Sequence, residues 1–240
     1  MVDETNLKEE MDWVNENYAK VAVANLQKKR INAQYVPNRE EALVKALELI
    51  PSEATIGRGD SITLSQIGLI DKLHEDKSHQ FIDPFERTED GKYLIPGPGH
   101  WELMRKALSA DVFLTGINAV TMDGKLVSID SIGNRVAGMI FGPPKVLIVT
   151  GVNKIVKNLD EAMERIKWAA PINVKRHYIK HGFEGLNKLP CYKTGFCVDC
   201  NSPDQICSYI VIIKGQQGPK GSTDYLPRIN VIIVGEELGI

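Results

Sequence analysis

The sequence predicts an α/β fold, with a mainly parallel sheet flanked by helices and one added antiparallel hairpin. Short apolar runs alternate with amphipathic helical runs along the chain, as in strand–helix–strand units. Residues 145–150 form an uninterrupted apolar run, the pattern of a strand covered on both faces. Asp123 and Gly124 separate two strand-like segments, and this dipeptide is a strong hairpin signal because glycine adopts positive φ at little cost.

Length and charge bound the class of protein. The chain has 240 residues, of which 43% are hydrophobic and 25% are charged, and this favours one domain spanning 1–240. A net charge of −2 argues against a nucleic-acid surface, which needs a clustered basic excess. The acidic N-terminus lacks the apolar core of a signal peptide, and no apolar run approaches the roughly 20 residues of a membrane span. We therefore expect a cytoplasmic protein without a membrane span.

The first element is a long amphipathic helix at about residues 4–30. Apolar residues recur at alternating steps of four and three on one face: Leu7, Met11, Val14, Tyr18 and Val21. The favoured interpretation is that this helix simply covers the sheet. The alternative is that it packs on a second copy of the chain and forms a homodimer.

The other elements follow in order. Strands are expected at 33–37, 54–57, 80–83, 111–115, 118–122, 125–130, 145–150, 209–214 and 229–235. Capping boxes at Asn38 and Asn158 begin two helices, and the second is expected to end at Pro171. One continuous helix is expected after Ser61, and shorter helices at 100–110 and from 133 to about 141.

The first candidate site is the glycine-rich junction between the strand at 54–57 and the following helix. Its ligand-binding candidates are Gly57, Arg58, Gly59 and Ser61. Glycines let an anion approach the backbone, and free N–H groups at a helix start favour negative charge. The alternative is a tight turn in which Asp60 or Ser61 caps the helix.

The second candidate lies just beyond the hairpin. Asp130, Ser131, Asn134 and Arg135 offer a carboxylate, a hydroxyl, an amide and a guanidinium. This set can orient a small anionic substrate, with Asp130 as a catalytic base. The alternative is that Asp130 or Ser131 caps a helix. If the sheet is parallel, this segment should face the same crevice as the glycine turn.

The third candidate is the cysteine segment at 191–207. It holds every cysteine of the chain, namely Cys191, Cys197, Cys200 and Cys207. The sulfurs could bind a zinc ion or an iron–sulfur cluster, although the spacing matches no familiar zinc or ferredoxin pattern. A thiol–disulfide switch and inert thiols are the alternatives. His177 and His181, spaced one helical turn apart, could contribute ligands as well, but the favoured interpretation is that they are solvated residues of a basic helix.

The segments 56–64, 115–142 and 191–203 together resemble the LUD-domain proteins, the lactate-utilisation family, over residues 10 to 215. The resemblance implies the fold shared by glucosamine-phosphate deaminase, ribose-phosphate isomerase and the coenzyme A transferases. It implies a role in oxidation of lactate or a related 2-hydroxy acid alongside an iron–sulfur redox partner subunit. The alternatives are a protein that binds a phosphorylated or coenzyme A-linked metabolite, and a non-catalytic assembly subunit.

Overall fold

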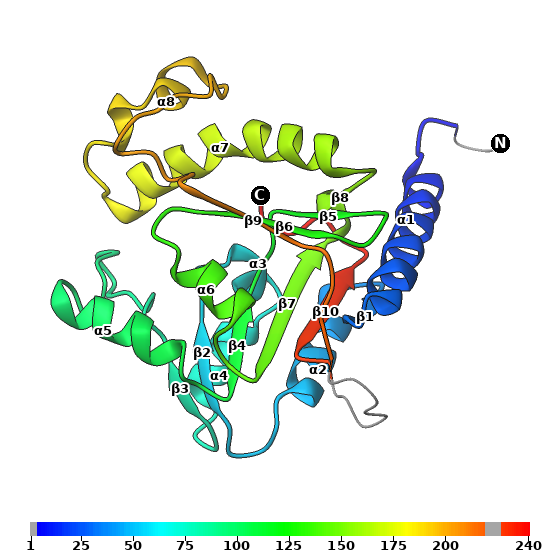
Figure 1. Cartoon of the computed structure of the whole chain (residues 1–240), viewed down its shortest axis with the longest axis horizontal. Coiled ribbons are helices and arrows are strands. Elements are labelled where there is room, and N and C mark those ends of the chain that lie inside the picture. Colours follow the sequence, from blue (N-terminus) through cyan, green and yellow to red (C-terminus); the bar gives the residue numbers. More distant parts are fainter. Residues whose placement is uncertain (1–3, 219–226) are drawn as a thin grey trace.

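A parallel sheet of six strands forms the centre of the molecule (Figure 1). The computed structural model describes residues 4–218 and 227–240. Strand order is β1-β10-β7-β4-β2-β3, and every neighbouring pair is parallel. The strands are β1 (Asn32–Val36), β2 (Thr55–Arg58), β3 (Gln80–Ile82), β4 (Val112–Thr115), β7 (Lys145–Gly151) and β10 (Ile229–Val234). The prediction of a mainly parallel α/β fold is confirmed.

Helices cover both faces of this sheet, because alternate residues of each strand point to opposite sides. One core packs α2 (Arg39–Leu49), α3 (Ile62–Gln66) and α4 (Leu69–Glu75) against side chains such as Ile56, Leu114 and Leu147. The opposite core packs α1 (Lys8–Lys28), α5 (Pro98–Ala107) and α6 (Asn134–Ile140) against Phe113 and Ile148. The apolar run 145–150 therefore lies in a strand buried from both sides, as expected.

The predicted hairpin belongs to a second, smaller sheet of order β8-β5-β6-β9. Its strands are β5 (Ala119–Thr121), β6 (Leu126–Asp130), β8 (Ile155–Val156) and β9 (Tyr209–Ile213). Strands β5 and β6 are antiparallel, and Gly124 in their turn has φ of 80°. Helix α7 (Leu159–His181) lies over this sheet and buries Ala162 and Ile166 against it (Figure 1).

Two helices differ from their predicted lengths. The single helix expected after Ser61 is split between α3 and α4 at Gly68, whose φ of 75° is left-handed and ends a helix. Helix α7 does not end at Pro171 but continues to His181. Burial of Ile166, Ala169 and Val174 on either side of the proline stabilises the helix across the missing backbone hydrogen bond.

The favoured interpretation of the N-terminal helix, that it covers the sheet, agrees with the structure, although the predicted apolar stripe is not the face that makes the contact. Helix α1 does cover the sheet, but it buries a different face, made by Ala19, Ala22 and Leu26. The large residues of the predicted stripe, including Met11 at 59% and Tyr18 at 47% exposure, face solvent. The face with small side chains is the one buried, because small side chains let the helix approach the strands closely. A second copy of the chain as the partner of this exposed stripe stays a prediction.

The remaining elements are the short helices η1 (Val152–Lys154), η2 (Leu186–Lys188) and α8 (Pro190–Thr194). Among the described residues, no helix has both the length and the apolar character needed to cross a membrane.

The topology creates a crevice at the end of β2. The chain crosses from β2 to β3 over one face of the sheet through α3 and α4. Beyond β4 it passes over the opposite face through α6 to reach β7. Strands β2 and β4 are neighbours, so loops leaving their carboxyl ends diverge to opposite faces. Such switch points are where open α/β sheets bind ligands.

Candidate functional site

A cavity of about 410 Å³ lies at the carboxyl end of the parallel sheet, beneath α7. Residues that follow four parallel strands line it, and each group lies just beyond the end of its strand. They are Asp60 and Ser61 after β2, Gly116 to Asn118 after β4, Lys154 after β7, and Gly239 and Ile240 after β10. The segment Asp130–Arg135 closes one side, so the structure brings the two predicted segments to one cavity.

In the glycine turn, tight packing accounts for both glycines. A Cβ on Gly57 would lie 2.5 Å from the carbonyl oxygen of Ala107, so this residue is an internal packing position. Gly59 lies under the side chain of Arg135. Ser61 lines the cavity, and its Oγ also accepts from the backbone N–H of Leu64 at 3.5 Å. Ser61 thus caps α3, as the alternative interpretation stated, while remaining at the cavity wall.

Arg58 does not line the cavity. Its Nε donates to Oδ1 of Asp83 at 2.7 Å, and both side chains are buried. Asp83 also accepts from the backbone N–H of Phe85 at 2.8 Å and contacts His74 at 3.0 Å. Arg58 also lies over the ring of Phe85, so its guanidinium joins the end of β2 to the segment that follows β3.

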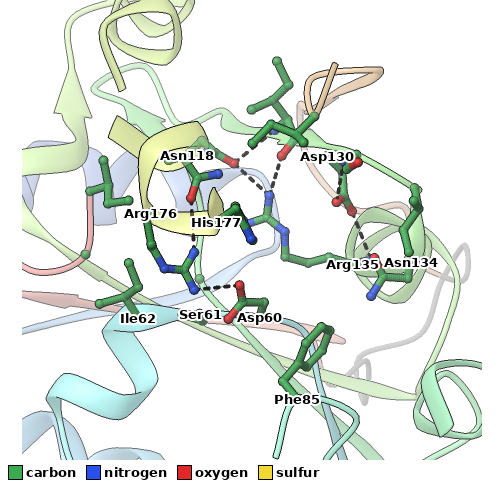
Figure 2. A pocket seen from close by; sticks show the side chains of 18 of the residues that line it. Asp60, Ser61, Ile62, Phe85, Asn118, Asp130, Asn134, Arg135, Arg176 and His177 are labelled. Atoms are coloured by element: carbon green, nitrogen blue, oxygen red, sulfur yellow. Dashed lines mark hydrogen bonds and ion pairs between the residues drawn. The ribbon is translucent and has the colours of Figure 1, made fainter. Parts of the chain in front are cut away.

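Figure 2 shows Arg135 and Asp130 side by side at the cavity wall. Nη2 of Arg135 donates to Oδ1 of Asn118 at 3.0 Å and to the carbonyl of Ile129 at 2.5 Å. Asp130 accepts from the backbone N–H groups of Ser131, Arg135 and Val136 at 2.9–3.1 Å. Oδ2 thereby caps α6, and Oδ1 holds the turn that precedes it. The role of Asp130 as a base stays a prediction, and Asn134 lines the cavity beside it.

Positive charge at the cavity wall comes from Arg135 and Lys154, and Arg165 lies behind them. Among the described residues, none of the three forms an ion pair with an aspartate or glutamate side chain, and Arg165 donates to the backbone oxygens of Asn118, Asn153 and Ile240. Lys154 is only 6% exposed, and its Nζ reaches Oγ1 of Thr63 at 3.4 Å. Burial, together with Arg165 and Arg135, lowers the pKa of Lys154 from 10.5 to about 7. Burial lowers the pKa of Arg165 to about 10. This excess of cations favours an anionic ligand.

Sequence reasoning missed Lys154 because the single lysine after an apolar strand carries no motif. Its position becomes informative only when the carboxyl ends of β2, β4 and β7 are known to be neighbours. The signal that existed was the long apolar run, whose carboxyl end marks the ligand side of a parallel sheet.

Across the cavity, Asp60 is paired with α7 (Figure 2). Nη2 of Arg176 donates to Oδ2 of Asp60 at 2.8 Å, and Nη1 donates to Oδ1 of Asn173 at 3.1 Å. Burial opposes ionisation of Asp60, but Arg176, His177 and Arg58 outweigh it and lower the pKa of this carboxyl. Asp60 is therefore a carboxylate at neutral pH.

The two histidines of α7 are not solvated residues, contrary to the interpretation drawn from their spacing. His177 lines the cavity, stacks on Phe183 at 5.4 Å between ring centres, and faces His181. Burial and the charge of Arg176 lower the pKa of each imidazole to about 4. Both rings are neutral at pH 7. Their four-residue spacing was the available signal, and only the fold placed Asp60 beside them.

Aromatic side chains line the other end of the cavity. They are Phe85, Tyr93, His100, Trp101 and Phe183. Tyr93 and His100 are stacked, with ring centres 4.1 Å apart. Nδ1 of His100 is buried without a hydrogen-bond partner among the described residues. The cavity thus has a cationic end and an aromatic end, which suits an amphipathic ligand.

The cysteine segment touches the cavity through Ile206 and Cys207. All of the cysteines are free thiols. Within residues 4–218 and 227–240, no group of three or more metal-ligating side chains whose ligand atoms lie within 4.8 Å of one another includes a cysteine. Burial, and the nearby thiols of Cys197 and Cys200, raise the pKa of Cys191 and of Cys207. Zinc or iron–sulfur binding by these sulfurs stays a prediction.

Comparison with known proteins gives a match to one family. The model of the LUD domain matches residues 19–235. Among solved structures, the chain is similar to one described as a DUF162 family protein from Deinococcus radiodurans. That similarity covers 93% of this chain and 97% of that chain at 12% sequence identity, with a TM-score of 0.46. No curated protein matches the chain.

Proposed function

The chain belongs to the LUD domain family, and we propose that its cavity binds a small 2-hydroxy carboxylate as part of lactate utilisation. The observation that carries this proposal is the pair of cations Arg135 and Lys154 at the cavity wall, with Arg165 behind them, because none of the three pairs with an aspartate or glutamate side chain among the described residues. A ligand carboxylate would offset the mutual repulsion of these cations. Asp60 and the neutral His177 on the opposite wall supply acceptors for a hydroxyl proton.

Oxidation of a 2-hydroxy acid to a 2-oxo acid releases two electrons and two protons. We propose that a redox partner subunit carrying iron–sulfur clusters accepts the two electrons one at a time, since the family resemblance implies such a partner. The cavity would hold the carboxylate and the hydroxyl, and Asp60 and His177 would receive the two protons, one from the hydroxyl and one from C2. The cytoplasm is the compartment expected for this chemistry.

Calorimetric titration tests the binding step. Lactate, glycolate and pyruvate should bind the wild-type chain. Replacing Lys154 by Met or Arg135 by Gln should weaken binding about tenfold or more, because each change removes a charge-assisted hydrogen bond worth about 1.5–3 kcal/mol. Lys157→Met is the matched control, since Lys157 is an exposed lysine three positions from Lys154. Equal affinity in wild-type and Lys154→Met protein would contradict the proposal.

Growth tests the pathway. A deletion strain should fail to grow on lactate as carbon source and should recover when the wild-type chain is returned. Normal growth of the deletion strain would remove the lactate assignment. Recovery by the Lys154→Met chain would favour a non-catalytic assembly subunit.

The size of the cavity favours a second candidate, a phosphorylated or coenzyme A-linked metabolite. A volume of about 410 Å³ exceeds what a three-carbon acid fills, and the aromatic end can take a planar ring. A thermal-shift series with sugar phosphates, nucleotides and acyl-coenzyme A compounds separates the candidates. A ligand at 100 times its Kd stabilises the fold by about 2.7 kcal/mol. Stabilisation by these compounds and none by lactate would select the second candidate.

A further inference from the structure

The last turn of α7 carries a cluster of metal-ligating side chains at the edge of the cavity. One carboxylate oxygen of Asp60 and one ring nitrogen each of His177 and His181 lie within 4.8 Å of one another. No other described residues form such a group of three or more. The members come from the loop after β2 and from α7, more than a hundred residues later, so the tertiary fold assembles them.

The geometry of the two imidazoles suits a shared ion. Histidines four residues apart on a helix lie on one face, one turn above the other. Nδ1 of His177 and Nδ1 of His181 face each other at 2.9 Å. Two nitrogens bound to one zinc ion, each at about 2.0–2.1 Å, stand roughly 3 Å apart. The side chains therefore need only small movements to bind a metal.

The charges around the cluster fit a cation on one side and oppose it on the other. An imidazole binds a metal through the lone pair of one ring nitrogen, and the Nδ1 atoms of His177 and His181 face a common space. The cluster also lies at the carboxyl end of a 23-residue helix, where the helix dipole favours positive charge. Arg176 is the nearest opposing cation, and Arg87 and Arg58 add to it.

Arg176 leaves one oxygen of Asp60 available. Its guanidinium donates to Oδ2 at 2.8 Å, and Oδ1 has no hydrogen bond from a described residue. Carboxylates that bind metals are commonly held in this way through their second oxygen, which fixes their orientation.

We propose that Asp60, His177 and His181 bind one divalent transition-metal ion of the zinc class at the edge of the cavity. Two imidazoles and one carboxylate are a ligand set for Zn²⁺, Fe²⁺, Co²⁺ or Ni²⁺, whereas Mg²⁺ and Ca²⁺ prefer oxygen ligands alone. Asp60 and His177 line the cavity, so the open coordination positions face it. The competing arrangement is a metal-free histidine pair in which one ring donates to the other.

Titration of the full-length, reduced and metal-stripped chain with Co²⁺ tests the proposal. Thiolate ligands give Co²⁺ a charge-transfer absorption in the near ultraviolet, and imidazole and carboxylate ligands do not. We expect one bound ion without the thiolate band. Asp60→Asn and His181→Gln should weaken binding about tenfold or more. The double variant Cys197→Ser/Cys200→Ser should bind as the wild type does.

His79→Ala is the matched control. Its Nδ1 contacts a carboxylate oxygen of Asp76 at 3.1 Å, but no second imidazole is part of that pair. Nuclear magnetic resonance of the wild-type chain gives a readout that needs no variant. Paramagnetic Co²⁺ should broaden the ring signals of His177 and His181 first among the five histidines.

Three results would overturn the proposal. One is the absence of Co²⁺ binding to the wild-type chain. The second is binding with a thiolate band that the cysteine double variant loses and His181→Gln keeps. The third is broadening that spares His177 and His181. Since lactate binding is measured without added metal, failure here leaves the proposed function standing.

Discussion

Arg135 crosses directly over Gly59, and its Cγ lies 2.9 Å from the point where a Cβ on that glycine would stand. The neighbour is a flexible side chain, so an added methyl group would displace Arg135 rather than the backbone. We expect Gly59→Ala to fold and to weaken anion binding several-fold. Calorimetry with the ligand identified for the wild-type chain is the measurement.

Gly57→Ala provides the contrast. Its Cβ would meet the backbone of Ala107 at 2.5 Å, and a helix backbone cannot move as a side chain does. Overpacking of this kind costs about 1–3 kcal/mol of unfolding free energy, measured by urea denaturation.

The two glycine variants also test the role of Arg135. If Gly59→Ala binds the ligand as tightly as the wild type does, the guanidinium of Arg135 does not hold the ligand.

Lys154→Met should stabilise the protein in a pH-dependent way. The pKa of Lys154 falls from 10.5 to about 7 on folding, so between these values the unfolded chain binds more protons and stability rises with pH. Below pH 7 the buried ammonium carries its full penalty. A shift of this size corresponds to roughly 5 kcal/mol, and cavity water reduces it, so we expect a gain of about 1–3 kcal/mol at pH 7.

The gain should shrink as the pH is raised toward 10. Paired urea titrations of wild-type and Lys154→Met protein at pH 7 and 10 measure it, with Lys157→Met as control. A gain equal at both pH values would show that the ammonium group is not the cause.

Arg58→Met should destabilise the fold without touching the ligand. Removing the guanidinium leaves the buried Asp83 carboxylate without its charged partner, which costs about 3–5 kcal/mol. The midpoint of urea denaturation reports this loss. Ligand affinity of the fraction that is folded should match that of the wild type. If fully folded Arg58→Met protein binds the ligand more weakly than the wild type does, Arg58 contacts the ligand after all.

Two variants of Asp130 distinguish a helix-capping role from a catalytic role. Asp130→Ala removes the acceptor for three backbone N–H groups and should cost about 0.5–2 kcal/mol. Asp130→Asn keeps an oxygen at the cap and should retain most of the stability and the ligand affinity. If lactate oxidation by the assembled system falls as far in Asp130→Asn as in Asp130→Ala, the carboxylate is the base and not only a cap.

The sequence by itself determined the local elements and the class of fold. Apolar runs, capping boxes and the Asp123–Gly124 turn depend on neighbours along the chain, and these predictions agree with the structure. The spacing of apolar residues did not predict the buried face or the length of a helix where contacts with distant segments decided them. Helix α1 buries its small residues rather than its large stripe, and α7 continues through Pro171 because both sides of it are buried.

Only the tertiary structure decided what the candidate residues contact. The glycine turn and the segment at Asp130 were both identified, but whether a guanidinium faces the cavity depends on the nearest carboxylate in space. Arg58 forms an ion pair with Asp83, whereas Arg135 donates hydrogen bonds to amide and carbonyl oxygens. Lys154, and the approach of Asp60 to His177 and His181, follow from the order of the parallel strands and the course of α7. Those contacts join residues far apart in sequence, so no local pattern records them.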